Sequence, residues 1–295
     1  MKFADYAALP GWNWSVIKRI EDSPKHADHY KRTKDSGDTA SRAGLRANHC
    51  AILEGPEALA AQFPVYPGKV RRGKAYDAWR AEQPEDCTPL LDRDHKIAVA
   101  IGKAVRDDPH AGPWVRDGFP EHVIEWVDAV TGLPCKLRLD YLTSTSSYSW
   151  AVTEVKSITS IAGYSVSSLV SRNKWDGQIA HYVDGVRAAA REGRLPGQMY
   201  PSPDPIIDAR LIVVETGPVH DVGVFRLHND EEGDALRVGA EYRAELLGKL
   251  KDAIGRGEWG GRYHEAGEQV LELQDWRKGL DDIETDVPDG EWQEL

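Results

Sequence analysis

Residues 150–160, with the sequence WAVTEVKSITS, place a glutamate and a lysine two positions apart near the end of an apolar, β-branched run. In a β-strand, residues i and i+2 point to the same face, so Glu154 and Lys156 share a face with Val152. An ordinary half-buried strand carries apolar or uncharged side chains at such positions. The pair is therefore either a salt bridge or part of a site that handles charge.

A second acidic residue ends the strand that is predicted just before this one. Within residues 134–142, PCKLRLDYL, Asp140 shares a face with Arg138. If the two strands form a hairpin, Asp140 and Glu154 can meet with Lys156 beside them. Two carboxylates in a partly buried place repel each other, and a hard divalent cation such as Mg²⁺ is their natural partner. The lysine can then hold or deprotonate a water molecule next to the ion, which predicts metal-assisted hydrolysis.

The acid-x-lysine spacing is a weak signal by itself, because 29% of the residues are charged. Asp94 and Lys96, in DHK, repeat the spacing within a helical pattern, where residues i and i+2 do not face each other. We interpret that copy as unrelated to a site. The spacing of Glu154 and Lys156 leaves open both an active site and a cross-strand salt bridge.

Three further polar residues favour the active site. Gln178 and Tyr182, in WDGQIAHYVDGV, lie four apart in a predicted helix and therefore on one of its faces. His49 lies in GLRANHCAIL, a predicted helix whose small residues would let another element approach closely. A lone histidine in a helix is otherwise a hydrogen-bonded helix residue without a chemical role.

The elements that must position these residues follow from hydrophobic periodicity and from turn signals. Strands are expected at about 121–129, 134–142 and 149–157, with a further pair within 207–228. Helices are expected from about Asn13 to Pro24 and directly after it, within 38–63 with an end at Gly55–Pro56, and over 90–108, 164–193 (in two pieces) and 230–257. Residues 64–90 are expected to be irregular. This order predicts an α/β domain with a mixed central sheet flanked by helices.

Charge is distributed unevenly along the chain of 295 residues, whose formal net charge is −11. Residues 280–295 carry seven acids and no lysine or arginine, so without them the net charge is −4. We expect one domain over 1–279 and an acidic tail over 280–295. In contrast, residues 68–80 mix aromatic residues with basic ones, a composition that suits a nucleic-acid groove as well as a solvated loop. The basic residues there include Lys69, Arg71, Arg72 and Lys74.

Composition also excludes several classes of protein. Cys50, Cys87 and Cys135 are far apart and odd in number, which argues against a disulfide framework and against a zinc or iron–sulfur site. No run of about 18 apolar residues occurs, and the first residues lack the basic and apolar regions of a secretory signal. We therefore expect a soluble, cytoplasmic protein with no membrane partner.

Five segments in the right order resemble the exonuclease VIII (RecE-like) nucleases, a phage and prophage branch of the PD-(D/E)xK superfamily. The segments are SVIKRIEDSPKHADHYKR, the helix GLRANHCAILEGPEALAAQFPVYP in place of the family's Gly-x-x-x-His helix, PEHVIEWVDAVTGLPCKLRLDYL, TEVKSI with the Gln-x-x-x-Tyr helix, and GEWGGRYHEAGEQVLELQDW. The resemblance implies a PD-(D/E)xK restriction-endonuclease-like core. The triplet begins with Glu here, as in much of the wider superfamily, where close relatives often have Asp.

The resemblance also implies roles for individual residues. A divalent ion, Mg²⁺ with Mn²⁺ as a substitute, would be bound by His49, Asp140, Glu154 and the backbone carbonyl of Val155. Lys156 would position or activate the attacking water, and Gln178 and Tyr182 would orient the scissile phosphate or the lysine. Glu121 would support the ion through surrounding contacts or hold a second one. The contacts to DNA would come from Lys69, Arg71, Arg72, Lys74 and Arg138.

The implied activity is digestion of duplex DNA ends from 5′ to 3′ in a bacterial host cell. It would leave a 3′ single strand for a single-strand annealing recombinase, and a homo-oligomeric ring of three or four subunits would surround the DNA. The residues themselves do not determine polarity, since the same site could nick or trim. A DNA-end-binding module on a degenerate nuclease fold is the other alternative, and the presence of all four residues His49, Asp140, Glu154 and Lys156 argues against it.

Overall fold

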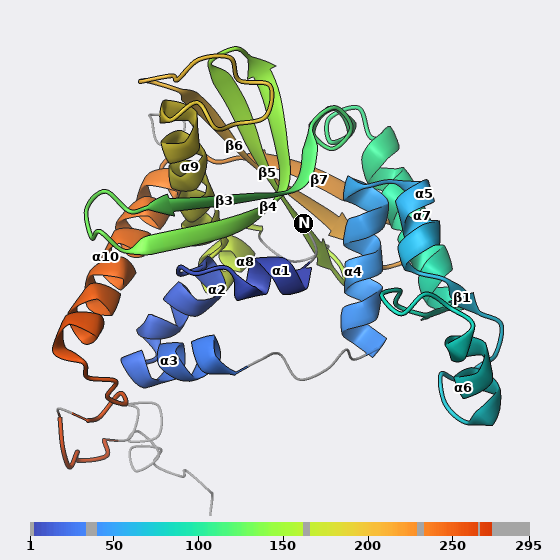
Figure 1. Ribbon diagram of the computed structural model, residues 1–295, viewed down its shortest axis with the longest axis horizontal. Coiled ribbons are helices and arrows are strands. Elements are labelled where there is room, and N and C mark those ends of the chain that lie inside the picture. The colour runs from blue at the N-terminus through green and yellow to red at the C-terminus, as the bar shows by residue number, and fades with distance from the viewer. Residues whose placement is uncertain (1–2, 34–39, 162–165, 229–232, 265, 273–295) are drawn as a thin grey trace, which may run out of the picture.

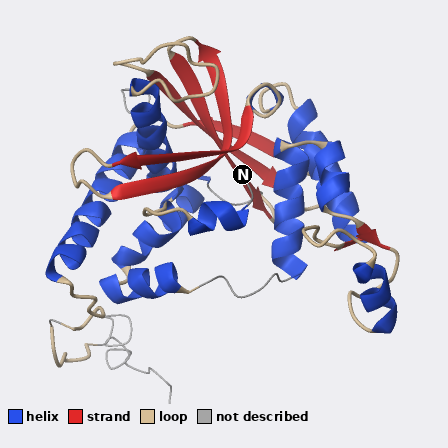
Figure 2. Cartoon of the chain, viewed as in Figure 1, coloured by secondary structure: helices blue, strands red, loops and turns tan. Residues whose placement is uncertain are grey.

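The computed structural model describes residues 3–33, 40–161, 166–228, 233–264 and 266–272, and it is built around a five-stranded mixed sheet (Figures 1 and 2). The strands follow one another across the sheet in chain order. They are β3 (Phe119–Val127), β4 (Pro134–Ser146), β5 (Ser149–Ile158), β6 (Ile206–Glu215) and β7 (Val222–Arg226). Neighbouring strands are antiparallel except for β5 and β6, which are parallel.

The parallel pair requires a crossover, and two helices form it. These are α8 (Val166–Asn173) and α9 (Trp175–Arg191), which were expected as one helical region in two pieces. Helix α9 packs closely on β4, because a Cβ atom at Gly185 would lie 2.3 Å from the side chain of Leu137. This close approach brings one face of α9 against the middle of the sheet.

The larger hydrophobic core lies on the face of the sheet that α9 covers. Helix α10 (Ala235–Arg256) packs beside α9, and the N-terminal elements complete this layer (Figure 1). They are α1 (Phe3–Ala8), α2 (Trp14–Ile17), the 3₁₀ turn η1 (Lys18–Glu21) and α3 (Pro24–Arg32). The Lys136 ammonium on β4 donates to backbone carbonyls at the end of α1, including Tyr6 O at 3.1 Å and Leu9 O at 2.6 Å, and so attaches α1 to the sheet.

The other face of the sheet carries α4 (Ala40–Leu53), α7 (Asp92–Asp107) and the 3₁₀ turn η2 (Gly112–Trp114), and α5 (Pro56–Gln62) packs on α4. The sequence predicts that small residues of this helix let another element approach closely, and three small residues of α4, Ala43, Ala47 and Ala51, are buried. They admit α7, since a Cβ atom at Gly102 would lie 2.8 Å from the Cβ of Ala51. The expected small-residue face is therefore confirmed, and α7 is the element that uses it.

The expectation that residues 64–90 are irregular is wrong in part. The segment contains α6 (Lys74–Ala81), and β1 (Val65–Tyr66) pairs in parallel with β2 (Leu90–Leu91). None of the residues of helix α6 is buried, so this helix adds nothing to the main core. It is held instead by a local aromatic cluster in which Tyr76 and Trp79 lie 5.1 and 5.2 Å from the ring of Tyr66.

Helix α4 ends at Leu53, before Gly55 and Pro56 as expected, and the strand pair β6–β7 is confirmed. The expected helix residues 38–39, 164–165 and 230–232 lie outside the described residues. All three cysteines are free and buried. In the described part of the chain, no helix combines the length and the apolar composition that a membrane crossing needs. The expected acidic tail lies outside the described residues, so the division at residue 279 stays a prediction.

Candidate active site

The candidate site forms where β4 and β5 stop pairing with each other. Their register runs from the turn up to the pair Tyr141–Thr153 and ends there. The next residue of β4, Asp140, uses its side chain in place of a ladder bond: its Oδ2 accepts a hydrogen bond from the backbone N–H of Val155 at 2.8 Å. The divergence of the two strands thus brings the Asp140 carboxylate next to Glu154 on β5.

A hydrogen-bond network connects Glu154 to the face of α9 that lies over the sheet. Gln178 Nε2 donates to Glu154 Oε1 at 2.7 Å and to the hydroxyl of Tyr182 at 2.8 Å. Lys156 Nζ donates to Glu154 Oε1 and, at 3.1 Å, to Gln178 Oε1. Because lysine can only donate, the orientation of the Gln178 amide is determined by its partners. The four residues that the sequence associated by spacing therefore contact one another.

One oxygen of Glu154 has no partner among the described residues. The side chain is 3% exposed, and Oε2 is a buried acceptor without a hydrogen bond. A buried polar atom without a partner costs free energy, and carboxylate oxygens are the ligands that Mg²⁺ prefers. The chemistry of this atom fits a bound cation.

The acidic residues of the site hold their protons more tightly than usual. Burial, and then repulsion from Asp140, raise the pKa of Glu154 to about 7, while burial also raises the pKa of Asp140. Burial, followed by repulsion from Asp140, raises the pKa of Glu121 to about 8. The positive charges of Lys156 and Arg138 thus neutralise these carboxylates only in part. A divalent cation binds most favourably where such negative charge is left over.

His49 faces the same carboxylates from α4. Its Nδ1 lies 3.8 Å from Asp140 Oδ1, too far for a hydrogen bond. Burial lowers its pKa to about 4, so the imidazole is neutral near pH 7. Neutral imidazole is the form that binds a metal ion. The structure thus brings His49 to the site in the protonation state that the predicted role requires.

Among the residues that the structure describes, there is no group of three or more His, Cys, Asp or Glu side chains already arranged to hold a metal ion. The two central carboxylates are engaged by the Val155 N–H, by Lys156 and by Gln178. The donor types and the charge fit a hard cation, and its binding stays a prediction. The same holds for the Val155 carbonyl as a ligand.

Glu121 and Arg138 form an ion pair next to Asp140. Glu121 lies between the β3–β4 pairs Pro120–Tyr141 and His122–Leu139, which places it across from Asp140. Its φ of 53° is unfavourable for a residue with a side chain, and such strain of about 1–3 kcal/mol concentrates at functional sites. Arg138, expected to contact DNA, is therefore placed beside the carboxylates.

The basic residues Lys69, Arg71, Arg72 and Lys74 lie away from this cluster. They belong to the segment from β1 to α6, in which Lys74 is the first residue of α6, and Figure 1 shows these two elements at one end of the molecule, beyond α4 and α7. The aromatic residues of this segment pack on each other, so they are not free platforms for base stacking. Arg71 donates to the carbonyl of Pro89 at 2.5 Å. A role of this segment in DNA binding stays a prediction.

Two residues that the sequence did not single out lie near Lys156. The centroid of the Trp175 ring is 5.6 Å from Lys156 Nζ. Burial, then repulsion from Arg19 and Lys156, lower the pKa of Lys18, which places its ammonium in the electrostatic field of the site. Trp175 precedes Gln178 by three residues in the same helix and could have been found by helical spacing. No local pattern relates η1 to β5.

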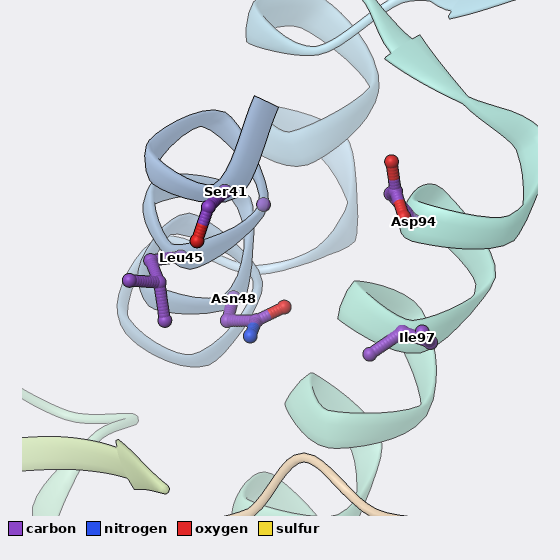
Figure 3. Close-up of a pocket in the computed structure, with 6 residues that line it drawn as sticks. Ser41, Leu45, Asn48, Asp94 and Ile97 are labelled. Carbon is purple, nitrogen blue, oxygen red and sulfur yellow. The ribbon is translucent and has the colours of Figure 1, made fainter. Parts of the chain in front are cut away.

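A hollow of about 180 Å³ lies between α4 and α7 (Figure 3). It is lined by Ser41, Leu45 and Asn48 on α4 and by Asp94 and Ile97 on α7, and Figure 3 shows Asn48 pointing toward Ile97. None of these residues belongs to the predicted site, and Asp94 is the acid of the DHK triplet. Its location on α7, with Lys96 paired to Asp92 at 2.7 Å, confirms that this triplet is a feature of a helix surface.

Comparison with known proteins identifies the fold. No protein-family model matches the chain, and no curated protein sequence matches it. The crystal structure of a "putative exonuclease" from Eubacterium rectale aligns over 91% of this chain and 92% of its own, with 14% identity and a TM-score of 0.52. The structure of SSO0001 aligns over 82% of this chain and 84% of its own, with 12% identity and a TM-score of 0.29. The fold is α/β, with a mixed five-stranded central sheet flanked by helices as expected, and it is similar to the fold of the Eubacterium rectale protein.

Proposed function

We propose that this protein is a Mg²⁺-dependent deoxyribonuclease of the exonuclease VIII (RecE-like) family, which hydrolyses phosphodiester bonds at duplex DNA ends. The observation that carries the proposal is the cluster at the β4–β5 divergence: Asp140 and Glu154 side by side, with Lys156 and Gln178 bound to Glu154. The buried, unpartnered Glu154 Oε2 adds a place for a cation. The likeness to the Eubacterium rectale protein supports the fold on which such a site is built.

In this proposal Asp140, Glu154 and His49 hold the ion, with the Val155 carbonyl as a further ligand. When bound, the ion polarises the phosphate and lowers the pKa of a water molecule. The protein's own residues do the rest. Lys156 Nζ holds the attacking water by a hydrogen bond, and Gln178 Oε1, 3.1 Å away, directs the ammonium. Burial and the nearby carboxylates raise the pKa of Tyr182 well above its usual value, so its hydroxyl keeps its proton and anchors Gln178.

Polarity, assembly and partners follow from the family resemblance. We propose digestion from 5′ to 3′, a ring of three or four subunits around the DNA, and transfer of the 3′ strand to a single-strand annealing recombinase. The segment with Lys69, Arg71, Arg72 and Lys74 would contact the DNA backbone, where lysine and arginine neutralise phosphates. An acidic exterior with a basic channel would reconcile DNA binding with a net charge of −11.

The test compares the Lys156→Ala variant with Lys96→Ala, which alters the lysine of the DHK triplet on α7. Linear duplex DNA, labelled separately at the 5′ and 3′ ends, is incubated with each protein and Mg²⁺. Lys156→Ala is expected to lose cleavage by a factor of about 10²–10⁴, while Lys96→Ala cleaves like the unaltered protein. Equal cleavage by both variants would refute the assignment. DNA binding without turnover by any of the proteins would favour a DNA-end-binding module.

A further inference from the structure

Trp175 extends the row of site residues on α9 by one turn. Trp175, Gln178 and Tyr182 are separated by three and four residues and so occupy one face of the helix. Gln178 and Tyr182 are both engaged in the network around Glu154. Trp175 therefore lies at the N-terminal end of this row, with its ring centroid 5.6 Å from Lys156 Nζ.

The start of α9 is held in place by a strained residue. Lys174, directly before Trp175, adopts left-handed backbone angles of φ 60° and ψ 40°, which cost a residue with a side chain about 1–2 kcal/mol. Its side chain is attached to two other elements: the ammonium lies 3.4 Å from Glu21 on η1 and 4.8 Å from the ring centroid of Tyr242 on α10. These contacts fix the point at which Trp175 leaves the turn.

The Trp175 ring is not needed to hold Lys156. The lysine ammonium is already bound by Glu154 Oε1 and Gln178 Oε1. A distance of 5.6 Å is close to the limit of about 6 Å at which a cation and an aromatic ring attract each other. The ring packs partly on the main hydrophobic core and keeps part of its surface exposed. A large, partly exposed aromatic surface beside a phosphate-handling lysine is what base stacking requires.

We propose that Trp175 stacks on the nucleobase next to the scissile phosphate and so sets the position of the DNA strand at Lys156. This inference rests on the proposed nuclease function and adds a contact to the substrate that the metal and the charged residues do not provide. Stacking is tolerant of sequence, because every base has an aromatic face. The contact would therefore hold each successive nucleotide of a strand that is digested from its end.

The test measures the energetic coupling between Trp175 and the base. Duplexes carry one abasic residue at successive positions from the digested end. The unaltered protein is expected to cleave about tenfold more slowly when the abasic residue lies next to the scissile phosphate. Trp175→Leu is expected to cleave normal DNA about tenfold more slowly and to show no further loss with the abasic residue. Trp259→Leu, which alters a partly buried tryptophan stacked on Trp12 at 6.3 Å, should keep the full abasic penalty.

A metal-free binding measurement separates this inference from the proposed activity. DNA with 2-aminopurine at the same position should lose fluorescence when it binds the full-length protein, and should not when it binds Trp175→Leu. Quenching without any cleavage would support the stacking contact and refute the nuclease. Cleavage with the same abasic penalty and the same quenching in both proteins would refute the stacking contact and leave the nuclease standing. Absence of any DNA binding would refute both.

Discussion

Glu154→Gln distinguishes a metal ligand from a salt-bridge partner, because the substitution removes one negative charge at nearly constant side-chain volume. Glu154 is buried, its Oε2 is unpartnered among the described residues, and its pKa is raised to about 7. That pKa already includes the attraction of Lys156, which is outweighed by burial and by Asp140. The ionised side chain is therefore a net cost to the folded, metal-free protein.

The size of this cost follows from the linkage between protonation and folding. The unfolded chain has the ordinary glutamate pKa of 4.5, so the folded protein binds this proton more tightly. Below pH 4.5, Glu154 makes its full contribution to the free energy of unfolding. This contribution is lost as the pH rises to about 7, by about 1.4 kcal/mol per pH unit. The total is about 3 kcal/mol, and the glutamine variant does not lose it. For a protein of this size the gain in Tm is roughly 5–10 °C.

The assay is thermal unfolding at about pH 8, in EDTA and in Mg²⁺. Glu154→Gln is expected to unfold at a higher temperature than the unaltered protein in EDTA. Mg²⁺ should raise the Tm of the unaltered protein and leave that of the variant unchanged, since the ligand is gone. Glu57→Gln, an exposed acid on α5, is the matched control and should differ by less than about 0.5 kcal/mol in both buffers. A lower Tm for Glu154→Gln in EDTA would show that Glu154 stabilises the fold by pairing with Lys156, and would refute the reasoning.

Four further expectations concern other parts of the molecule. Asp140→Asn should abolish cleavage of linear DNA yet keep a native circular dichroism spectrum, because the amide oxygen can still accept the backbone N–H bond. Arg243→Met should lower the free energy of unfolding in urea by about 3–5 kcal/mol, since it leaves Asp128, now paired at 2.9 Å, buried without its cationic partner and with only the hydrogen bonds from Thr131. Burial lowers the pKa of His181 to about 3, so this residue destabilises the fold as the pH falls below 6.5, the ordinary pKa of histidine. His181→Gln should therefore reduce the loss of unfolding free energy between about pH 7 and 5 by about 2 kcal/mol. Urea unfolding at both pH values measures this difference. Deleting the residues after Gly279 removes seven negative charges and should tighten DNA binding at low salt, with the difference disappearing as salt is raised in fluorescence anisotropy titrations.

The local pattern of the sequence determined the main elements and four residues of the candidate site. Alternation with β-branched residues predicted β3, β4 and β5, and a spacing of two placed Glu154 and Lys156 on one face. A spacing of four placed Gln178 and Tyr182 together on α9. These predictions depend on backbone geometry that repeats within one element, so no knowledge of the neighbouring elements is needed.

The tertiary structure decided which faces meet and in what environment. His49 is 91 positions from Asp140 in the chain, and only the packing of α4 against the sheet brings them to 3.8 Å. Helical spacing alone places Trp175 on the face of Gln178 and Tyr182, but only the packing of α9 against the sheet brings its ring centroid to 5.6 Å from Lys156 Nζ. The raised pKa of Glu154 depends on burial by several layers at once, so the spacing of two charges could not tell a salt bridge from a buried acid in need of a cation. Sequence periodicity specifies the direction of a side chain from its own backbone, whereas its neighbours and its solvent exposure are properties of the whole fold.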